Sequence, residues 1–560
     1  MKDLYRSLED QLPELLQAIA TAWQVTLPDG AARLQAQQLG DAMLAPGALE
    51  RVLTQRSPAA LALLGDLVRA GGVLPAPRLA PAYGEIRRDG PARLIREQPW
   101  NQPANPLEEL YYVGLIDRGN ATVGAYTGQA IIVPTQWVER LRPLLSAPAP
   151  LGVAEIEPPA IVRTAGAAIV EDLFALLVAV RHERVPAPPA PTAGEPQRWP
   201  RLDIDARLQG EPDPTRLALV AHLAWRLGLV RAEEGVLRPG PRAREWLRIS
   251  DQRRLRSAFL AWRDDRRWNE LRQLRALRSD QPLNPASVRH AFLEVLAECP
   301  PERWLALDSF LAALKRRRAD YLRSDADYTA WRVTDVETNE LLTGAASWER
   351  VEGALARHLL TTSLRWLGLV AIGQTSSASE PTAFAITAPG AALLAGAPPD
   401  QEAAAPPLQA AISDDLVITL PLTETLHERW QLERFAQWQS QAGQASYRVT
   451  PDSLWRGYNA GVQVEQVQRF LTRISGDRLP APALHSLLAW SGRFGRVRLS
   501  EVLLLEAQDE HTMKQITSRA ELRALLGAAL SPTTCLVDRS QASRLIAKLR
   551  GLGVWPKLGA

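Results

Sequence analysis

One short pattern occurs three times in this chain and restricts its fold more than any other feature. A helical stretch ends at Gly-Leu followed by Ile or Val, and a variable polar segment then leads to a short apolar strand that meets a proline. Glycine suits the left-handed residue at a helix C-terminus, and proline suits a strand end that is followed by a helix. We therefore expect three similar units. The glycines are Gly114, Gly228 and Gly368, and the prolines are Pro134, Pro239 and Pro389.

Each unit is predicted to contain helices, then a β-hairpin, then a further helix. In the first copy Ser57-Pro58 supplies an N-cap and a first helical residue, a helix is expected at 107–112, and apolar strands flank a polar turn up to Val133. This order is that of a winged helix, in which one helix can enter the major groove and the hairpin can contact the backbone. Unrelated helical domains that share only the helix-Gly-strand junction remain the alternative.

The length of 560 residues predicts three or four domains, because single cores stop growing at roughly 250–300 residues. Proline-rich segments mark the boundaries, and the densest of them, Val185 to Pro191, is expected to loop out inside the second unit. The predicted fold is multidomain and mainly α, with α+β parts. Its expected domains are 1–147 (N-terminal helices and first winged-helix-like unit), 155–250 (second unit), 251–397 (third unit) and 413–560 (a small α+β domain).

Positive charge gathers in two places although the whole chain carries only +3. Between Arg242 and Arg278, twelve arginines and five acidic residues give a net charge of +7, and Trp246, Trp262 and Trp268 are interleaved as stacking or core residues. A phosphate-contacting surface is one interpretation, and a solvated helix face is the other. The candidate nucleic-acid-binding residues are Arg248, Arg253, Arg254, Arg256, Arg266, Arg267, Lys315, Arg316, Arg317 and Arg318.

Motifs for catalysis are missing from the sequence. No lysine follows a glycine, so the Gly-Lys-Ser/Thr phosphate loop is absent, and the scattered histidines and the two cysteines lack zinc-site spacing. Adjacent carboxylates such as Asp264-Asp265 could hold Mg²⁺ in a nuclease, but neighbouring side chains point apart. The sequence therefore predicts no enzyme, no catalytic residues, no cofactor and no metal site.

The N-terminus lacks a basic region followed by an apolar core, and Glu171 and Asp172 interrupt the longest apolar run, 165–180. A cytoplasmic protein without a membrane segment is expected.

The C-terminal block has the clearest local pattern. Leu416 to Leu420 forms a strand pattern closed by Pro421, and Thr450-Pro451 supplies an N-cap and a first helical residue. Further helices follow, and 496–499 and 502–505 are expected to be strands. The block is therefore predicted to be a small α+β domain.

Several strings in this block carry a family resemblance: Leu416-Val417-Ile418, Tyr447-Arg448-Val449-Thr450, Phe470-Leu471, Leu479-Pro480, Trp490 and Gly495-Arg496-Val497-Arg498-Leu499. Residues 415–555 resemble the bacterial helicase-associated family related to the N-terminal domain of XPB-type helicases. The order of elements is also similar to the clutch domain of the TFIIH subunit that anchors XPB.

The resemblance implies a non-catalytic accessory protein that docks on an XPB-type DNA helicase, or on a copy of itself, in DNA repair or transcription. Trp490, Arg496 and Arg498 are the expected docking residues. Together with the upstream units, this predicts a DNA-binding adaptor. The alternatives are a protein-interaction scaffold or a winged-helix transcription regulator without a helicase partner, and, more remotely, a nuclease.

Overall fold

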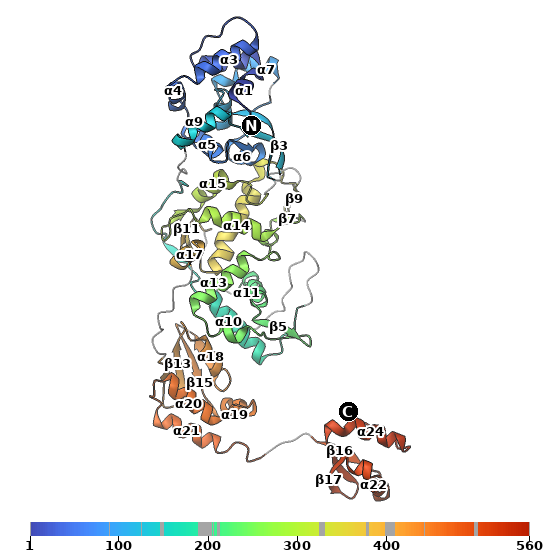
Figure 1. The fold of residues 1–560 in the computed structure, drawn as a ribbon. Helices are drawn as coiled ribbons and strands as arrows, with labels where there is room; N and C mark the ends of the chain where they lie inside the picture. Colours follow the sequence, from blue (N-terminus) through green and yellow to red (C-terminus); the bar gives the residue numbers. More distant parts are fainter. Residues whose placement is uncertain are drawn as a thin grey trace. The chain divides into compact units, whose positions relative to one another are not determined.

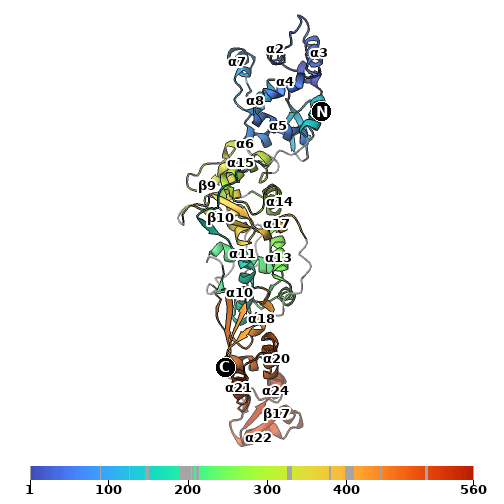
Figure 2. The ribbon, with the colours of Figure 1, turned by 90° about the vertical axis from the view of Figure 1, so that its left-hand side faces the viewer.

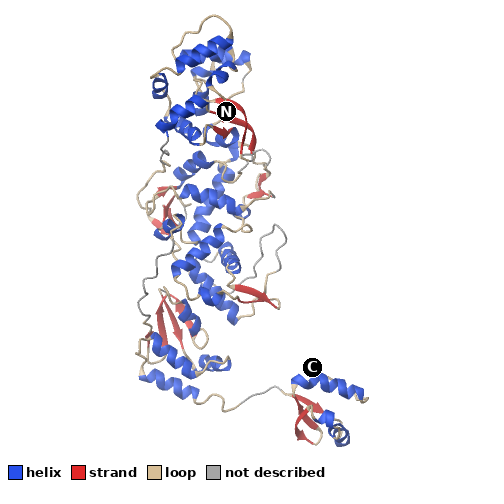
Figure 3. Cartoon of the chain, viewed as in Figure 1, coloured by secondary structure: helices blue, strands red, loops and turns tan. Residues whose placement is uncertain are grey.

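The computed structural model of this chain separates into two compact units (Figure 1). The large unit comprises Met1–Ala411, Ile418–Glu433 and Gln437–Arg448, and the small unit comprises Ile412–Val417, Arg434–Ala436 and Val449–Ala560. Helices predominate and the sheets are small, as Figure 3 shows, so the expected multidomain α and α+β character is confirmed. The structure describes residues 2–88, 90–124, 126–145, 151–188, 204, 207–209, 213–279, 281–323, 331–376, 380–397, 409–441, 443–497 and 502–558.

The first repeat, in residues 2–145, combines a helical layer with a three-stranded antiparallel sheet. Ser57 caps α5 by accepting a hydrogen bond from the amide of Ala60, and β3 lies between β1 and β2 in the sheet. The core of this region forms from apolar helix faces that include Leu16, Leu64 and Trp137. Its elements are α1 (Leu4–Glu9), α2 (Pro13–Ala22), α3 (Ala32–Met43), α4 (Ala48–Thr54), α5 (Pro58–Arg69), β1 (Val73–Pro75), α6 (Ala76–Tyr83), α7 (Pro91–Glu97), α8 (Pro106–Tyr111), β2 (Asp117–Val123), β3 (Tyr126–Ile132) and α9 (Thr135–Leu145).

The second repeat uses a short extended segment in place of its first strand. The amide of Leu237 donates to the carbonyl of Val185 at 2.8 Å, and Pro186 forms a bridge with Val236. Val185 to Ala187 therefore pair with β6, and the expectation that they loop out is wrong, because their backbone finds partners there; 189–191 lie outside the described residues. The elements are α10 (Ala168–His182), α11 (Pro214–Arg226), β5 (Val230–Glu233), β6 (Val236–Pro239) and α12 (Ala243–Trp246).

The third repeat is built around a four-stranded sheet with the order β4-β10-β11-β8. Its middle helical stretch, Glu349 to Leu364, is α-helical at the centre and π-helical on either side. The elements are β4 (Ile161–Arg163), α14 (Pro285–Leu296), β8 (Leu305–Ala306), α15 (Leu307–Arg318), α16 (Ala354–Leu359), β10 (Val370–Gln374), β11 (Ala383–Ile386) and α17 (Ala388–Leu394).

All three repeats share one arrangement around the junction glycine. Gly114, Gly228 and Gly368 have φ angles of 72°, 69° and 74°, which confirms the left-handed glycines expected at these helix ends. In each repeat the second hairpin strand pairs with the first hairpin strand on one side and with an earlier extended segment on the other. The repeats are therefore alike in strand order as well as in sequence.

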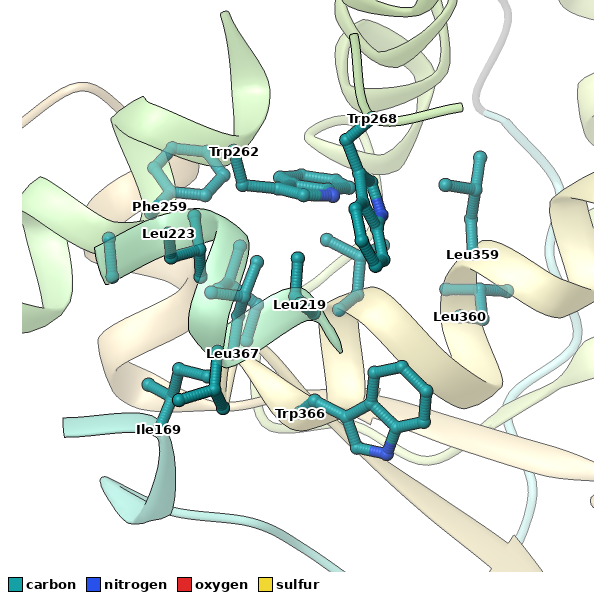
Figure 4. Close-up of a cluster of buried hydrophobic side chains, with 14 of the residues drawn as sticks. Ile169, Leu219, Leu223, Phe259, Trp262, Trp268, Leu359, Leu360, Trp366 and Leu367 are labelled. Carbon is teal, nitrogen blue, oxygen red and sulfur yellow. The ribbon is translucent and has the colours of Figure 1, made fainter. Parts of the chain in front are cut away.

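A tryptophan-rich core joins the second and third repeats. Trp262 and Trp268 lie with Leu219 and Leu223 of α11, while Trp366 and Leu360 come from the helical stretch of the third repeat (Figure 4). The neighbouring elements are α13 (Asp251–Arg263), the 3-10 helix Glu270–Gln273, and the strand pair β7 (Leu277–Ser279) and β9 (Val333–Asp335). The interleaved tryptophans are thus core residues. Both views place α10, α11 and α13 side by side (Figures 1 and 2).

The segment that follows the third repeat begins with a four-stranded sheet in the order β12-β13-β15-β14. Leu426 of α18 is fully buried in the same core as α10, so this helix belongs to the large unit. The elements are β12 (Ala411–Ile412), β13 (Val417–Pro421), α18 (Leu426–Leu432), β14 (Gln437–Gln441) and β15 (Gln444–Arg448).

The small unit contains three helices followed by a three-stranded sheet in the order β16-β18-β17. The expected strand at 502–505 is confirmed as β16. Of the expected strand at 496–499, Arg496 and Val497 lie instead in a bend that follows Gly495, whose φ is 71°, and 498 and 499 lie outside the described residues. The elements are α19 (Pro451–Asn459), α20 (Val464–Ile474), α21 (Ala481–Ser491), β16 (Leu503–Glu506), α22 (Glu510–Thr517), α23 (Ala520–Arg523), β17 (Leu526–Ser531), β18 (Thr534–Val537) and α24 (Ala542–Gly551).

A search of the described residues for a helix with the length and apolar character needed to cross a membrane found none.

Candidate nucleic-acid interface

Arg254 anchors the start of the arginine-rich segment from the inside. Its side chain is only 2% exposed; Nε donates to the carbonyl of Trp246 at 3.0 Å and Nη2 to that of Leu247 at 2.8 Å. The guanidinium also pairs with Asp251 in the first turn of α13. These bonds satisfy carbonyls at the end of α12, so Arg254 holds α12 against α13. A phosphate contact would require breaking them, and we remove Arg254 from the candidate interface.

Asp265 closes the turn after α13 and is itself buried. It accepts hydrogen bonds from the amides of Arg267 and Trp268, both at 2.7 Å, and it lies 3.2 Å from Nε2 of His222. Burial opposes its charge, but His222 and the two amides outweigh this and hold the pKa of Asp265 well below its usual range. The carboxylate is therefore a structural anion.

Glu270 plays a similar part in the next turn. It accepts from Nε1 of Trp262 at 2.7 Å and from Nε and Nη2 of Arg289 at 3.0 and 2.8 Å. Nη1 of Arg289 also donates to the carbonyls of Trp262 and Asp265. This buried network fixes the end of α13 to α14, and a buried ion pair of this kind is stable because its remaining donors and acceptors are also satisfied.

Two of the five acidic residues of the segment, Asp265 and Glu270, are buried, which makes its surface more basic than its sequence suggests. Asp251, Asp265 and Glu270 pair within the fold as above, and Asp264 accepts from Arg263 and lies 2.8 Å from His290. The fifth, Glu245, is exposed. Nine of the twelve arginines are exposed: Arg242, Arg244, Arg248, Arg253, Arg266, Arg267, Arg272, Arg275 and Arg278.

Three further candidates differ in exposure. Arg256 is half-buried, and its Nη1 donates to the carbonyl of Ala397 after α17, so it is partly used in packing. Arg266 and Arg267, in contrast, are exposed in the turn that Asp265 fixes. A turn held by buried hydrogen bonds presents its two guanidinium groups at low entropic cost, which favours anion binding.

The second basic cluster, at the end of α15, is largely neutralised by this chain. Lys315 pairs with Glu349, Arg317 with Glu298, and Arg318 with Glu294 at 2.8 Å. Arg316 is exposed and lines a cleft with Asp66, Arg69 and Arg78. The four cations therefore come from one helix end, but three of them bind carboxylates of the same fold.

The helices that would enter a major groove in a winged-helix arrangement are covered. In α11, Leu219, His222 and Leu223 are buried, and in the short α8, Leu107 and Leu110 are buried. Neither helix presents the row of exposed polar side chains that base recognition requires. Contact with DNA in this chain would therefore use the exposed arginines.

Sequence reasoning missed a buried network between α10 and α18. Nη1 of Arg429 lies 2.8 Å from Oε1 of Glu171, Nε2 of Gln441 donates to the other oxygen at 2.7 Å, and the guanidinium lies 4.7 Å from the ring centre of Phe174. Burial raises the pKa of Glu171. The available signal was the carboxylate pair that interrupts the apolar run of α10, because a charge in such a run needs a partner.

A second link joins the arginine-rich helix to the segment containing α18. The amide of Asp251, the first residue of α13, donates to Oε1 of Glu424 at 2.8 Å, and the amide of Glu424 donates back to Oδ2 of Asp251 at 2.9 Å. The sequence gives no sign of this reciprocal pair, because its members lie 173 positions apart. It fixes the start of α13 to the turn before α18.

The expected docking residues belong to the small unit. Trp490 is half-exposed near the end of α21, and Arg496 is exposed, with Nε donating to the carbonyl of Gly492 at 2.9 Å. Arg498 lies outside the described residues. Among the residues that the structure describes, no three His, Cys, Asp or Glu side chains are grouped as a metal site requires.

Comparisons with known proteins relate the C-terminal part of the chain to helicases. Residues 411–531 match the family described as helicase conserved C-terminal domain. The chain is 30% identical over 115 residues to the DNA 3'-5' helicase XPB of Mycobacterium tuberculosis, covering 20% of this chain and 21% of that protein. It is equally similar to the DNA 3'-5' helicase XPB of Kineococcus radiotolerans, covering 20% of each protein. The chain thus spans about a fifth of the length of these relatives.

These matches support the helicase relationship expected from the sequence, and they correct one expectation. The chain was expected not to be an enzyme, but a helicase C-terminal domain match and helicase relatives point to a helicase-type protein. Helicases are ATP-dependent enzymes. The expectation failed because it relied on one phosphate-loop pattern, whereas the helicase match lies in a segment of packing and capping residues.

Proposed function

We propose that this chain is a helicase-related protein that binds DNA and works in ATP-dependent strand separation together with an XPB-type helicase. The observation that carries the proposal is a direct hydrogen-bonded contact between the helicase-like segment and the arginine-rich helix α13. The helicase-like segment, residues 411–531, includes β13 and α18, and the reciprocal Asp251–Glu424 hydrogen bonds join it to the arginine-rich α13. A DNA contact on the arginine surface would therefore be held in a fixed position relative to this part of the helicase-like segment.

The exposed arginines support DNA binding without base recognition. Because Asp265 and Glu270 are buried and paired inside the fold, the exposed arginines dominate the surface and attract phosphates, and the covered faces of α8 and α11 are not available for reading bases. Binding should weaken steeply as salt rises and should depend little on sequence. In this proposal the three repeats are winged-helix-like modules that act as a scaffold for the arginine surface.

The partner is proposed from the likeness to the XPB relatives. A docking role for the small unit, with Trp490, Arg496 and Arg498 at the contact, follows the resemblance to the clutch domain, and the same surface would serve self-association. Repair and transcription are the processes in which such a complex would work.

The covered helices also favour a second candidate, a protein-interaction scaffold. Its repeats would pack against partner proteins, and the arginines would then be solvated side chains.

Charge reversal at exposed arginines separates the two candidates. We expect Arg266→Glu with Arg267→Glu to reduce duplex affinity and to lower the salt slope by about 0.9 for each phosphate that is no longer neutralised. Arg318→Glu is the matched control, because Arg318 already binds Glu294. Duplex binding that is unchanged in the double variant, or absent at low salt in the wild-type chain, would favour the scaffold.

The helicase part is tested by ATP hydrolysis and strand separation on forked DNA. Both are measured for the chain alone, for an XPB-type helicase alone and for the mixture. We expect the chain to support ATP-dependent unwinding by itself or to increase that of the helicase. No effect on hydrolysis, unwinding or helicase binding would refute this part of the proposal.

A further inference from the structure

The small unit carries exposed aromatic side chains on one face of α19. Trp455 is 54% exposed and Tyr458, three residues later on the same helical face, is 36% exposed. Leu454 and Gly457, each one position earlier on the helix, are buried. Large aromatic rings are seldom left in water, and Trp137, Trp262 and Trp348 of this chain are almost fully buried. Trp455 and Tyr458 therefore place two large aromatic rings in solvent on one face of α19.

The helix that carries these rings is firmly held. Thr450 and Ser453 form a capping box at its start, and the Ser453 hydroxyl also donates to the carbonyl of Phe435 at 2.8 Å. At Gly457 the helix lies so close to a neighbouring segment that a Cβ atom would come within 2.9 Å of the carbonyl oxygen of Arg434. A rigid support lowers the entropic cost of binding to the exposed face.

The turn after α21 brings more aromatic and basic groups to the same place. The ring centres of Phe494 and Tyr458 are 5.5 Å apart, and the Tyr458 hydroxyl lies 3.0 Å from where a Cβ of Gly495 would be. Arg493 and Arg496, on either side of this contact, are exposed. The sequence from 478 to 500 contains arginines but no aspartate or glutamate. Aromatic rings thus lie beside cations without nearby acidic residues in this stretch.

We propose that Trp455, Tyr458 and Phe494, with Arg493 and Arg496, form a binding site for single-stranded DNA. Bases stack on exposed aromatic rings with little regard to sequence, and arginines contact the phosphates between them. Duplex DNA does not fit, because its bases are already stacked on one another. Near the rings in sequence, the exposed Arg456, Arg493 and Arg496 outnumber the exposed Asp452, and this positive excess favours a polyanion over a polypeptide.

The inference shares with the proposed function only the premise that the chain acts on DNA. The site lies in the small unit, whereas the arginine surface belongs to the large unit. Separated strands are the product of a helicase reaction, so a site for one of them would suit a helicase-related protein.

The test uses the full chain and a labelled oligo(dT), with binding followed by fluorescence anisotropy. We expect Trp455→Ala to weaken binding by about fivefold to a hundredfold, the range that stacking gives on alanine substitution, and Trp455→Phe to restore most of it. Arg493→Glu with Arg496→Glu should weaken binding and reduce its salt dependence. Trp555→Ala is the matched control, because Trp555 is 73% exposed outside the site, and it should leave affinity unchanged.

Two results would overturn the inference. One is an oligo(dT) affinity that is the same in Trp455→Ala and in the wild-type chain, including the absence of any binding. The other is unchanged oligo(dT) binding together with weaker binding to an XPB-type helicase, which would make this face a protein-docking surface. Duplex binding, measured on the same preparations, reports on the arginine surface separately, so failure of one site is distinguishable from failure of the other.

Discussion

Replacing Arg429 by alanine should open the contact between α18 and α10. The side chain is 1% exposed and bridges Glu171 and Gln441, so its removal leaves a buried carboxylate without its countercharge. Breaking a buried ion pair from one side costs about 3–5 kcal/mol. Because about 1.4 kcal/mol is a tenfold change in an equilibrium, the open population of this region should rise by about 10²-fold to 4 × 10³-fold.

Hydrogen exchange followed by mass spectrometry is the suitable assay, because it reports local opening rather than unfolding of the whole chain. Amides of β14 and β15 should exchange faster in Arg429→Ala, whereas those of α1 to α9 should not change. Arg448→Ala is the control, since Arg448 is exposed on β15 and surface contacts are worth about 0–1 kcal/mol. Equal exchange in both variants would refute the assignment of Arg429 as the residue that holds this contact.

Three further outcomes are expected. Gly368→Ala should lower the melting temperature far more than Gly235→Ala. Both glycines have a positive φ, but a Cβ atom at position 368 would lie 2.1 Å from the carbonyl oxygen of Gly166, whereas a Cβ atom at position 235 would have nothing within 4 Å. Burial alone would raise the pKa of Glu433, but His182 and Arg207 lower it. The ionised Glu433 therefore stabilises the fold above the ordinary glutamate pKa, and this stabilisation is lost as the pH falls through the lowered pKa. In Glu433→Gln, the melting temperature should change less with pH on the acid side than it does in the wild-type chain. A chain that ends at residue 448 should melt cooperatively, whereas a chain that ends at residue 412 should not, because it lacks Leu426 and Arg429. Similar melting curves for the two truncated chains would contradict this expectation.

Local features of the fold could be predicted from the sequence because they depend on one residue and its neighbours. The junction glycines are visible because only glycine adopts a positive φ at a helix end without strain, and Ser57 is visible because its side chain caps the helix that it precedes. The pairing of Val185 with β6 could not be predicted, because the partner strand lies about 50 positions away and proline-rich sequence usually indicates a loop. The turn at 495–497 was mistaken for a strand because alternating Arg and Val imitate strand periodicity.

Charge was the least predictable property of the candidate interface. A count of residues treats the arginines of the 242–278 segment as equivalent, yet Arg254 is buried and bound to two carbonyls while Arg266 is exposed. Two of the carboxylates that dilute the positive charge in the sequence, Asp265 and Glu270, are buried against His222 and Arg289, which lie outside the segment. Only the fold reveals these partners.

The two basic regions differ in which of their charges are paired within the fold. At the end of α15, a run of four adjacent cations looks the more basic in sequence, but Lys315, Arg317 and Arg318 face carboxylates supplied by other helices. In the α13 region, Asp265 and Glu270 find buried partners within the fold, whereas most of the arginines remain exposed. A phosphate is attracted by positive charge that the fold leaves exposed, which is why we propose the DNA contact in the α13 region, a region that Glu424 also ties to the helicase-like segment.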